Sequence, residues 1–241
     1  MMYQEQIHNY IEENKAEIVN TLKELVKIPS VKDVTEIGAP FGKACAEVLE
    51  YTEKLYRGSG FETELDVDGG YLLSYYGIGE KSLGLFAHAD IVPVDNDWNF
   101  AKPFDPVEKD GFLIGRGTLD DKSAVVISLY CAKMLNELSI PFNSRLVCFT
   151  GANEESGMQD IKNYVSKHKT PDFSLVCDTA FPLYRGNKGR LTFTAMCDEP
   201  LCEINDISGS NVKGAILGKA VITLNYDKEI YEKLKACEMK A

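Results

Sequence analysis

The stretch 83-LGLFAHAD-90 joins a short apolar run to a polar end. Residues 83–87 have the length and composition of a buried strand, and His88 and Asp90 follow at its carboxyl end. Further along the chain, segments of alternating type are expected: a helix, a strand, a helix and a strand, at 123–138, 145–150, 158–167 and 173–177. This alternation predicts an α/β fold, with a mostly parallel sheet and helices on both of its faces.

The segments that precede this stretch are expected to flank the sheet. Apolar residues at helical spacing predict helices at 3–27 and 41–57. Alternating residues at 61–67 and 71–77 surround a glycine-rich turn and predict a hairpin. The proline-containing segment 91–111 is expected to be a long loop.

The character of the sequence changes beyond about residue 190. Strands are expected at 191–197 and 220–226, and a helix at 227–237. We therefore expect residues 191–241 to begin a second unit of the α+β type.

The composition is that of a globular protein and argues against several classes of function. The 241 residues include 37 acidic and 26 basic ones, a net charge of −11, which argues against nucleic acid or an anionic membrane as a partner. No signal-peptide pattern opens the chain, and no apolar run approaches the length of a membrane span. The seven cysteines are odd in number and form no CxxC pair, which predicts reduced thiols and a cytoplasmic protein.

Four polar clusters share one feature, because each follows a predicted strand or opens a predicted helix. They are His88-Ala-Asp90, Asp120-Asp121-Lys122, Glu154-Glu155 and Asp178. The carboxyl ends of parallel strands meet at one edge of a sheet, so these clusters are expected to converge. One imidazole and several carboxylates form a ligand set for zinc or a similar ion. Of the two adjacent glutamates, one can bind the metal while the other acts as a general base.

Each cluster also has a purely structural interpretation. His88 can be a hydrogen-bonded core histidine, and Asp120-Asp121 can cap the helix that follows. Glu154-Glu155 can be first-turn carboxylates that a helix dipole favours, and Asp178 can be a turn residue. The residues alone leave the metal site and these structural roles open.

Several ordered motifs resemble those of peptidase family M20, the dinuclear zinc family of dipeptidases, aminoacylases and succinyl-diaminopimelate desuccinylase. The motifs are 86-FAHADIVPV-94, 115-GRGTLDDK-122, 151-GANEESG-157, 177-CDTAFP-182 and 28-IPSV-31. The resemblance covers residues 3–190 strongly and the remainder weakly. It implies that 1–190 is a metallopeptidase catalytic portion and that 191–241 begins a lid or dimerisation-type domain.

The resemblance also implies a ligand set. His88 and Asp178 would each bind one metal, Asp120 would bridge the two metals, and Glu155 would bind the other one. A complete site would hold two zinc ions, although carboxylate-rich sites also accept cobalt or manganese.

The implied reaction is hydrolysis of an amide or peptide bond in a dipeptide, with N-acyl amino acids as further candidate substrates. Glu154 would be the general base, and Asp90 would orient the imidazole of His88.

The chain departs from the family pattern in its second half. No histidine follows His168, so the second metal would have only Asp120 and Glu155 as ligands. The resemblance therefore implies an incomplete catalytic domain, which self-associates or requires a complementary C-terminal chain. The alternative function is an inactive fragment that binds metal or such a chain without turnover.

Overall fold

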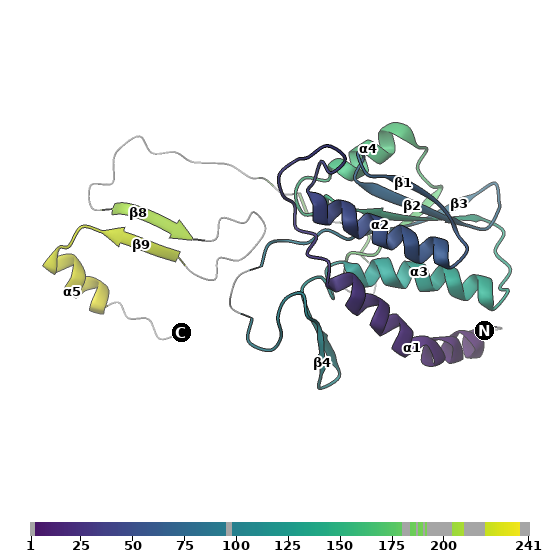
Figure 1. Cartoon of the computed structure of the whole chain (residues 1–241), viewed down its shortest axis with the longest axis horizontal. Coiled ribbons are helices and arrows are strands. Elements are labelled where there is room, and N and C mark those ends of the chain that lie inside the picture. The colour runs from purple at the N-terminus through teal and green to yellow at the C-terminus, as the bar shows by residue number, and fades with distance from the viewer. Residues whose placement is uncertain are drawn as a thin grey trace. The chain divides into compact units, whose positions relative to one another are not determined.

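The computed structural model describes residues 3–94, 98–179, 184–186, 188–189, 191, 204–209 and 220–236. The chain divides into two compact units, Met1–Tyr184 and Arg185–Ala241, and each is described by itself. Figure 1 labels most of the helices and strands of both units.

The first unit is built around a five-stranded sheet. In spatial order its strands are β1 (Glu62–Asp66), β2 (Tyr71–Tyr76), β6 (Arg145–Gly151), β3 (Ser82–His88) and β7 (Phe173–Val176). Strand β3 pairs in parallel with both β6 and β7, whereas the β1–β2 hairpin continues the sheet in antiparallel fashion from β6. The predicted α/β fold is confirmed, and its parallel part is the part that carries His88.

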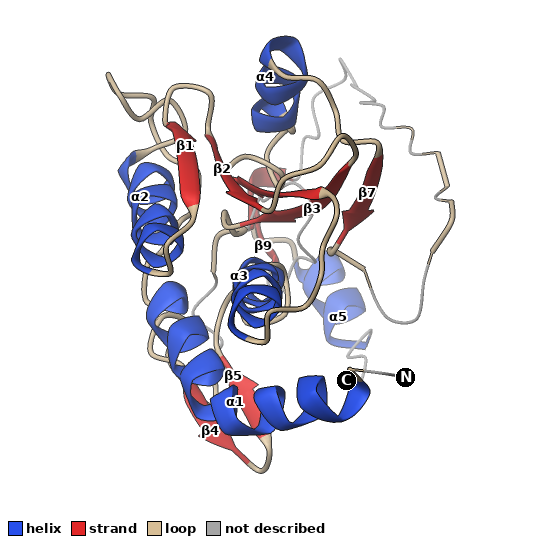
Figure 2. Cartoon of the chain, turned by 90° about the vertical axis from the view of Figure 1, so that its right-hand side faces the viewer, coloured by secondary structure: helices blue, strands red, loops and turns tan. Residues whose placement is uncertain are grey.

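Helices cover both faces of this sheet. Helices α2 (Lys43–Gly58) and α3 (Lys122–Glu137) pack on one face, and α1 (Gln4–Val26) packs against α3. Helix α4 (Gln159–Lys167) packs on the opposite face, as Figure 2 shows.

Strand alternation explains why the sheet has two apolar faces. Along β2, Leu72 belongs to the larger core on the side of α2 and α3, whereas Tyr71 and Leu73 join Tyr164 of α4 in a smaller aromatic core. Successive side chains of a strand point to opposite faces, so a strand covered on both sides is apolar at nearly every position.

The segment 91–111 is not a loop throughout, contrary to the prediction. It contains β4 (Val107–Lys109), which forms an antiparallel hairpin with β5 (Phe112–Ile114). The two turn residues, Asp110 and Gly111, have φ angles of 52° and 82°. An Asp-Gly pair readily adopts this left-handed conformation in a two-residue hairpin turn.

The second unit contains β8 (Ile204–Gly209), which pairs antiparallel with β9 (Ala220–Leu224), and helix α5 (Lys228–Ala236). Strand β9 and helix α5 confirm the predictions at 220–226 and 227–237, but β8 was not expected. All but the first residue of the strand predicted at 191–197 lies outside the described residues.

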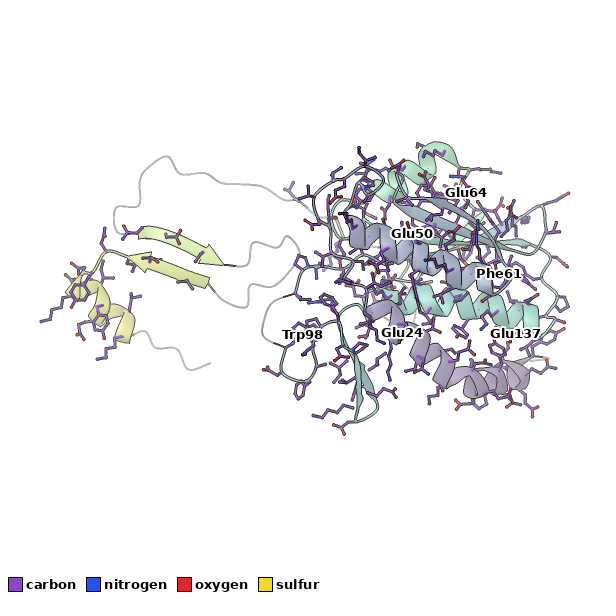
Figure 3. All side chains as sticks on the ribbon, in the orientation of Figure 1. Glu24, Glu50, Phe61, Glu64, Trp98 and Glu137 are labelled. Carbon is purple, nitrogen blue, oxygen red and sulfur yellow. The ribbon has the colours of Figure 1, made fainter. Side chains whose placement is uncertain are left out.

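Acidic residues on the first unit are spread over several elements. Glu24 of α1, Glu50 of α2, Glu64 of β1 and Glu137 of α3 are exposed, and Figure 3 labels their side chains.

Among the residues that the structure describes, no helix has the length and apolar character needed to cross a membrane.

Candidate metal centre

The candidate site lies at the carboxyl ends of the parallel strands. His88 is the last residue of β3 and pairs in register with Gly151, the last residue of β6. Glu154 and Glu155 follow β6 by only a few residues, and Asp178 lies two residues beyond β7. The parallel register therefore brings three separate segments to one edge of the sheet.

The imidazole of His88 is at the centre of the cluster. The distance from its Nε2 is 3.2 Å to Oδ1 of Asp120, 3.8 Å to Oδ2 of Asp178 and 3.9 Å to Oε2 of Glu154. The His88 residue is only 3% exposed, whereas the Asp120 side chain is 63% exposed. The site is thus anchored in the core by the histidine and open to solvent at the aspartate.

Asp90 links the histidine to the two glutamates. Its buried carboxylate accepts hydrogen bonds from the backbone N–H groups of Glu154 and Glu155, both at 3.1 Å. Nδ1 of His88 lies 3.0 Å from the main-chain oxygen of Asp90 and 3.3 Å from its Oδ1. These acceptors favour the tautomer with the proton on Nδ1, which leaves Nε2 free to bind a metal.

The donor set fits a divalent metal ion. Nε2 of His88 is buried and has no hydrogen bond of acceptable geometry in the described part of the chain, although a buried polar atom normally has one. Ligand atoms of His88, Asp120 and Glu155 lie within 4.8 Å of one another, and so do those of His88, Asp121 and Asp178. An imidazole with carboxylates is a usual ligand set for zinc.

The electrostatics of the site also call for a cation. Burial, with repulsion from Asp120, raises the pKa of Glu155 to about 7, and burial raises the pKa of Asp121 to about 8. Burial opposes a charge on His88, but the carboxylates of Asp120 and Asp90 raise its pKa to about 11. A bound cation would neutralise these carboxylates in place of the imidazole proton.

Asp121 lies in the candidate site, although the sequence suggested for it only a helix-capping role, and its side chain makes no capping hydrogen bond to α3. It is buried, and its Oδ2 accepts a hydrogen bond of 3.2 Å from the backbone N–H of His88. In the sequence only its position directly after Asp120 points to it. That position does not show which of the two carboxylates is buried.

The structure brings together all six residues that the sequence singled out. They are His88, Asp90, Asp120, Glu154, Glu155 and Asp178. A cavity of about 110 Å³ is lined by His88, Glu154 and Asp178 together with apolar residues such as Phe86 and Ile161. The arrangement combines a group of candidate metal ligands, a further glutamate beside them and an adjoining apolar pocket.

Comparison of the sequence with known proteins finds a matching family and several relatives. A sequence model of peptidase family M20/M25/M40 matches residues 84–235. A protein of Staphylococcus epidermidis whose name includes the word dipeptidase is 34% identical over 200 residues, which cover 82% of this chain and 41% of that relative. A similarly named protein of Staphylococcus haemolyticus is 32% identical and is covered to 40% of its length. The chain thus spans about two fifths of the length of these curated relatives.

Solved structures share the fold. Human carnosine dipeptidase 1 superposes with a TM-score of 0.65 at 21% identity, covering 74% of this chain and 42% of that one. An M20 family metallo-carboxypeptidase from Sulfolobus solfataricus gives a TM-score of 0.55 at 22% identity, covering 67% of this chain and 37% of that one.

Proposed function

Because the chain belongs to peptidase family M20/M25/M40, we propose that its site hydrolyses the amide or peptide bond of a dipeptide or a related small substrate. The observation that carries this proposal is the buried Nε2 of His88, which makes no hydrogen bond of acceptable geometry with any described residue and faces Asp120, Asp178 and Glu154 within 3.9 Å. N-acyl amino acids are a second candidate class of substrate, because they contain the same bond.

Zinc is the proposed cofactor, with two ions in a complete site. His88 and Asp178 would hold one ion, Glu155 the other, and Asp120 would lie between them. A bound ion of this kind supplies Lewis acidity, which polarises a carbonyl oxygen and makes a water molecule more acidic. Cobalt or manganese can take the place of zinc, because carboxylate-rich sites discriminate weakly between such metals.

Glu154 is the proposed general base. Its carboxylate is half-buried, and Oε2 lies 3.9 Å from Nε2 of His88, so it borders the ligand cluster. It would take a proton from the attacking water and return it to the nitrogen of the leaving amine. Asp90 would keep the imidazole of His88 in its ligating orientation through Nδ1.

The chain by itself would provide only part of the complete metal site. Asp120 and Glu155 would leave the second ion one protein ligand short of the three that catalytic zinc usually has. We therefore propose that 1–190 is an incomplete catalytic portion of a cytoplasmic peptidase and that 191–241 begins a lid or dimerisation-type domain. The missing third ligand favours a second candidate, a chain that binds metal or a complementary chain without turnover.

Hydrolysis of a dipeptide panel with added zinc separates the two candidates. The first predicts turnover once a complementary C-terminal chain supplies the missing ligand, and loss of that turnover in the Glu154→Gln variant while it retains zinc. The Glu50→Gln variant is the matched control, since Glu50 is exposed on α2 and should leave turnover unchanged. Zinc binding without turnover, even with the complementary chain present, would favour the second candidate. Absence of zinc binding would contradict the first candidate and would leave, of the second, only binding to a complementary chain.

A further inference from the structure

Lys122 is fully buried, although it follows the solvent-exposed Asp120 by only two residues. Its Nζ donates hydrogen bonds to the main-chain oxygens of Leu25, at 3.0 Å, and Ile28, at 2.6 Å. Leu25 lies in the last turn of α1, where carbonyl groups have no partner within the helix. The lysine therefore connects the start of α3 to the end of α1 and to the loop that follows it, residues 28–31.

The 28–31 loop in turn holds the segment that carries His88. Oγ of Ser30, which is buried, donates a hydrogen bond of 2.6 Å to the main-chain oxygen of Ala89. The backbone N–H of Ile91 donates to the main-chain oxygen of Ser30 at 3.1 Å, and Val31 forms a parallel bridge with Ile91. Ala89 lies between His88 and Asp90, so these contacts act on both residues at once.

Gly117 provides the space that this arrangement needs. A side chain there would meet Ile91 at 3.0 Å and the aliphatic stem of Lys122 at 3.1 Å, and the φ angle of Gly117 is 86°. The main-chain oxygen of Gly117 also accepts a hydrogen bond from the backbone N–H of Lys122. Glycine is favoured where the backbone adopts this conformation and another group approaches closely.

We propose that Lys122 and Ser30 are positioning residues that fix the His88–Asp90 segment relative to Asp120 and thereby set the geometry of the metal site. The inference rests on the metal site of the proposed function and adds two residues that touch neither metal nor substrate. Asp120 and Lys122 belong to one short segment, and the contacts of Lys122 and Ser30 lead from it to Ala89. If these hydrogen bonds were lost, the His88–Asp90 segment would be free to move relative to Asp120. The distance between Nε2 of His88 and the Asp120 carboxylate would then change.

The test compares metal binding with fold stability in two variants. Lys122→Met keeps most of the buried stem but removes the donors, and Ser30→Ala removes the bond to Ala89. Zinc affinity is measured by competition with a chelator, the visible absorption of bound cobalt(II) reports the ligand geometry, and thermal unfolding in EDTA reports the metal-free fold. We expect both variants to bind zinc about 10- to 100-fold more weakly and to alter the cobalt spectrum, as loss of groups that orient ligands does.

The Ser74→Ala variant is the matched control for Ser30→Ala. Ser74 is equally buried, on β2, but its hydroxyl makes no hydrogen bond with any described residue, so the variant should keep the zinc affinity and the cobalt spectrum. Unchanged affinity and spectrum in both test variants, with a lower unfolding temperature in EDTA, would overturn the inference. Ser30→Ala decides alone if Lys122→Met does not fold. If the unmodified chain binds neither metal, the metal site of the proposed function fails, and this inference fails with it.

Discussion

Replacing Asp90 with asparagine removes one of the two carboxylate oxygens that hold the turn after β6. Each oxygen accepts one backbone N–H at 3.1 Å, from Glu154 and from Glu155. The amide of asparagine keeps one acceptor but places an NH₂ group against the other N–H. One hydrogen bond to a charged acceptor is therefore lost at a buried position.

The expected magnitude follows from these contacts. A hydrogen bond to a charged group contributes about 1.5–3 kcal/mol, so we expect the Asp90→Asn variant to lose about 2 kcal/mol of unfolding free energy in EDTA. Nδ1 of His88 keeps the main-chain oxygen of Asp90 at 3.0 Å, so its tautomer is preserved. The loss of zinc affinity should therefore lie near the lower end of the usual range for such partners, about tenfold.

Urea unfolding in EDTA and zinc titration against a competing chelator measure the two effects. The Asp66→Asn variant is the control, because Asp66 also accepts a backbone N–H, from Gly69 at 2.7 Å, and belongs to neither candidate ligand group. It should lower stability and leave zinc affinity unchanged. An Asp90→Asn variant that binds zinc as tightly as the unmodified chain would refute the reasoning.

Three further perturbations test other parts of the structure. The Leu72→Ala variant empties a fully buried position in the larger core and should cost about 2–5 kcal/mol in urea unfolding; a loss below about 1 kcal/mol would contradict the packing. Hydrogen bonds from Lys133 and Tyr130 lower the pKa of Glu17, so the folded state gains stability above the ordinary glutamate pKa and loses it as the pH falls through the lowered value. Unfolding at pH values below the ordinary glutamate pKa should depend less on pH in the Glu17→Gln variant, and an unchanged dependence would count against this contact. Phe173 on the edge strand β7 is 62% exposed, so the chain should self-associate in size-exclusion chromatography and the Phe173→Glu variant should do so less; a concentration-independent monomer would refute this.

The parallel part of the fold was predictable because its signals are local. The apolar run that ends at His88 and the helical spacing at 123–138 each identify an element without knowledge of the others. The hairpin of β4 and β5 was missed because the prolines of segment 91–111 outweighed the turn signal of Asp110-Gly111. Strand β8 has the sequence INDISG, in which no clear alternation of polar and apolar residues appears.

The candidate site was predictable in its membership but not in its internal contacts. Their placement after predicted strands or at predicted helix starts marks all four polar clusters, and motif resemblance supplies the role of each residue. That the Asp90 carboxylate accepts hydrogen bonds from two residues 64 and 65 positions away depends on the register of β3 against β6. The inward turn of Asp121 and the contacts of Lys122 with α1 likewise arise from tertiary packing, which no local pattern encodes.

Equilibrium zinc binding to the purified chain and to its His88→Ala variant tests the central claim most directly. We expect at least one tightly bound zinc ion per chain, and loss of that ion when the buried Nε2 is removed. The His8→Ala variant is the control, because His8 lies on α1 and belongs to neither candidate ligand group. A chain that binds no zinc, or a His88→Ala variant that binds zinc as the unmodified chain does, would contradict a metal site at His88.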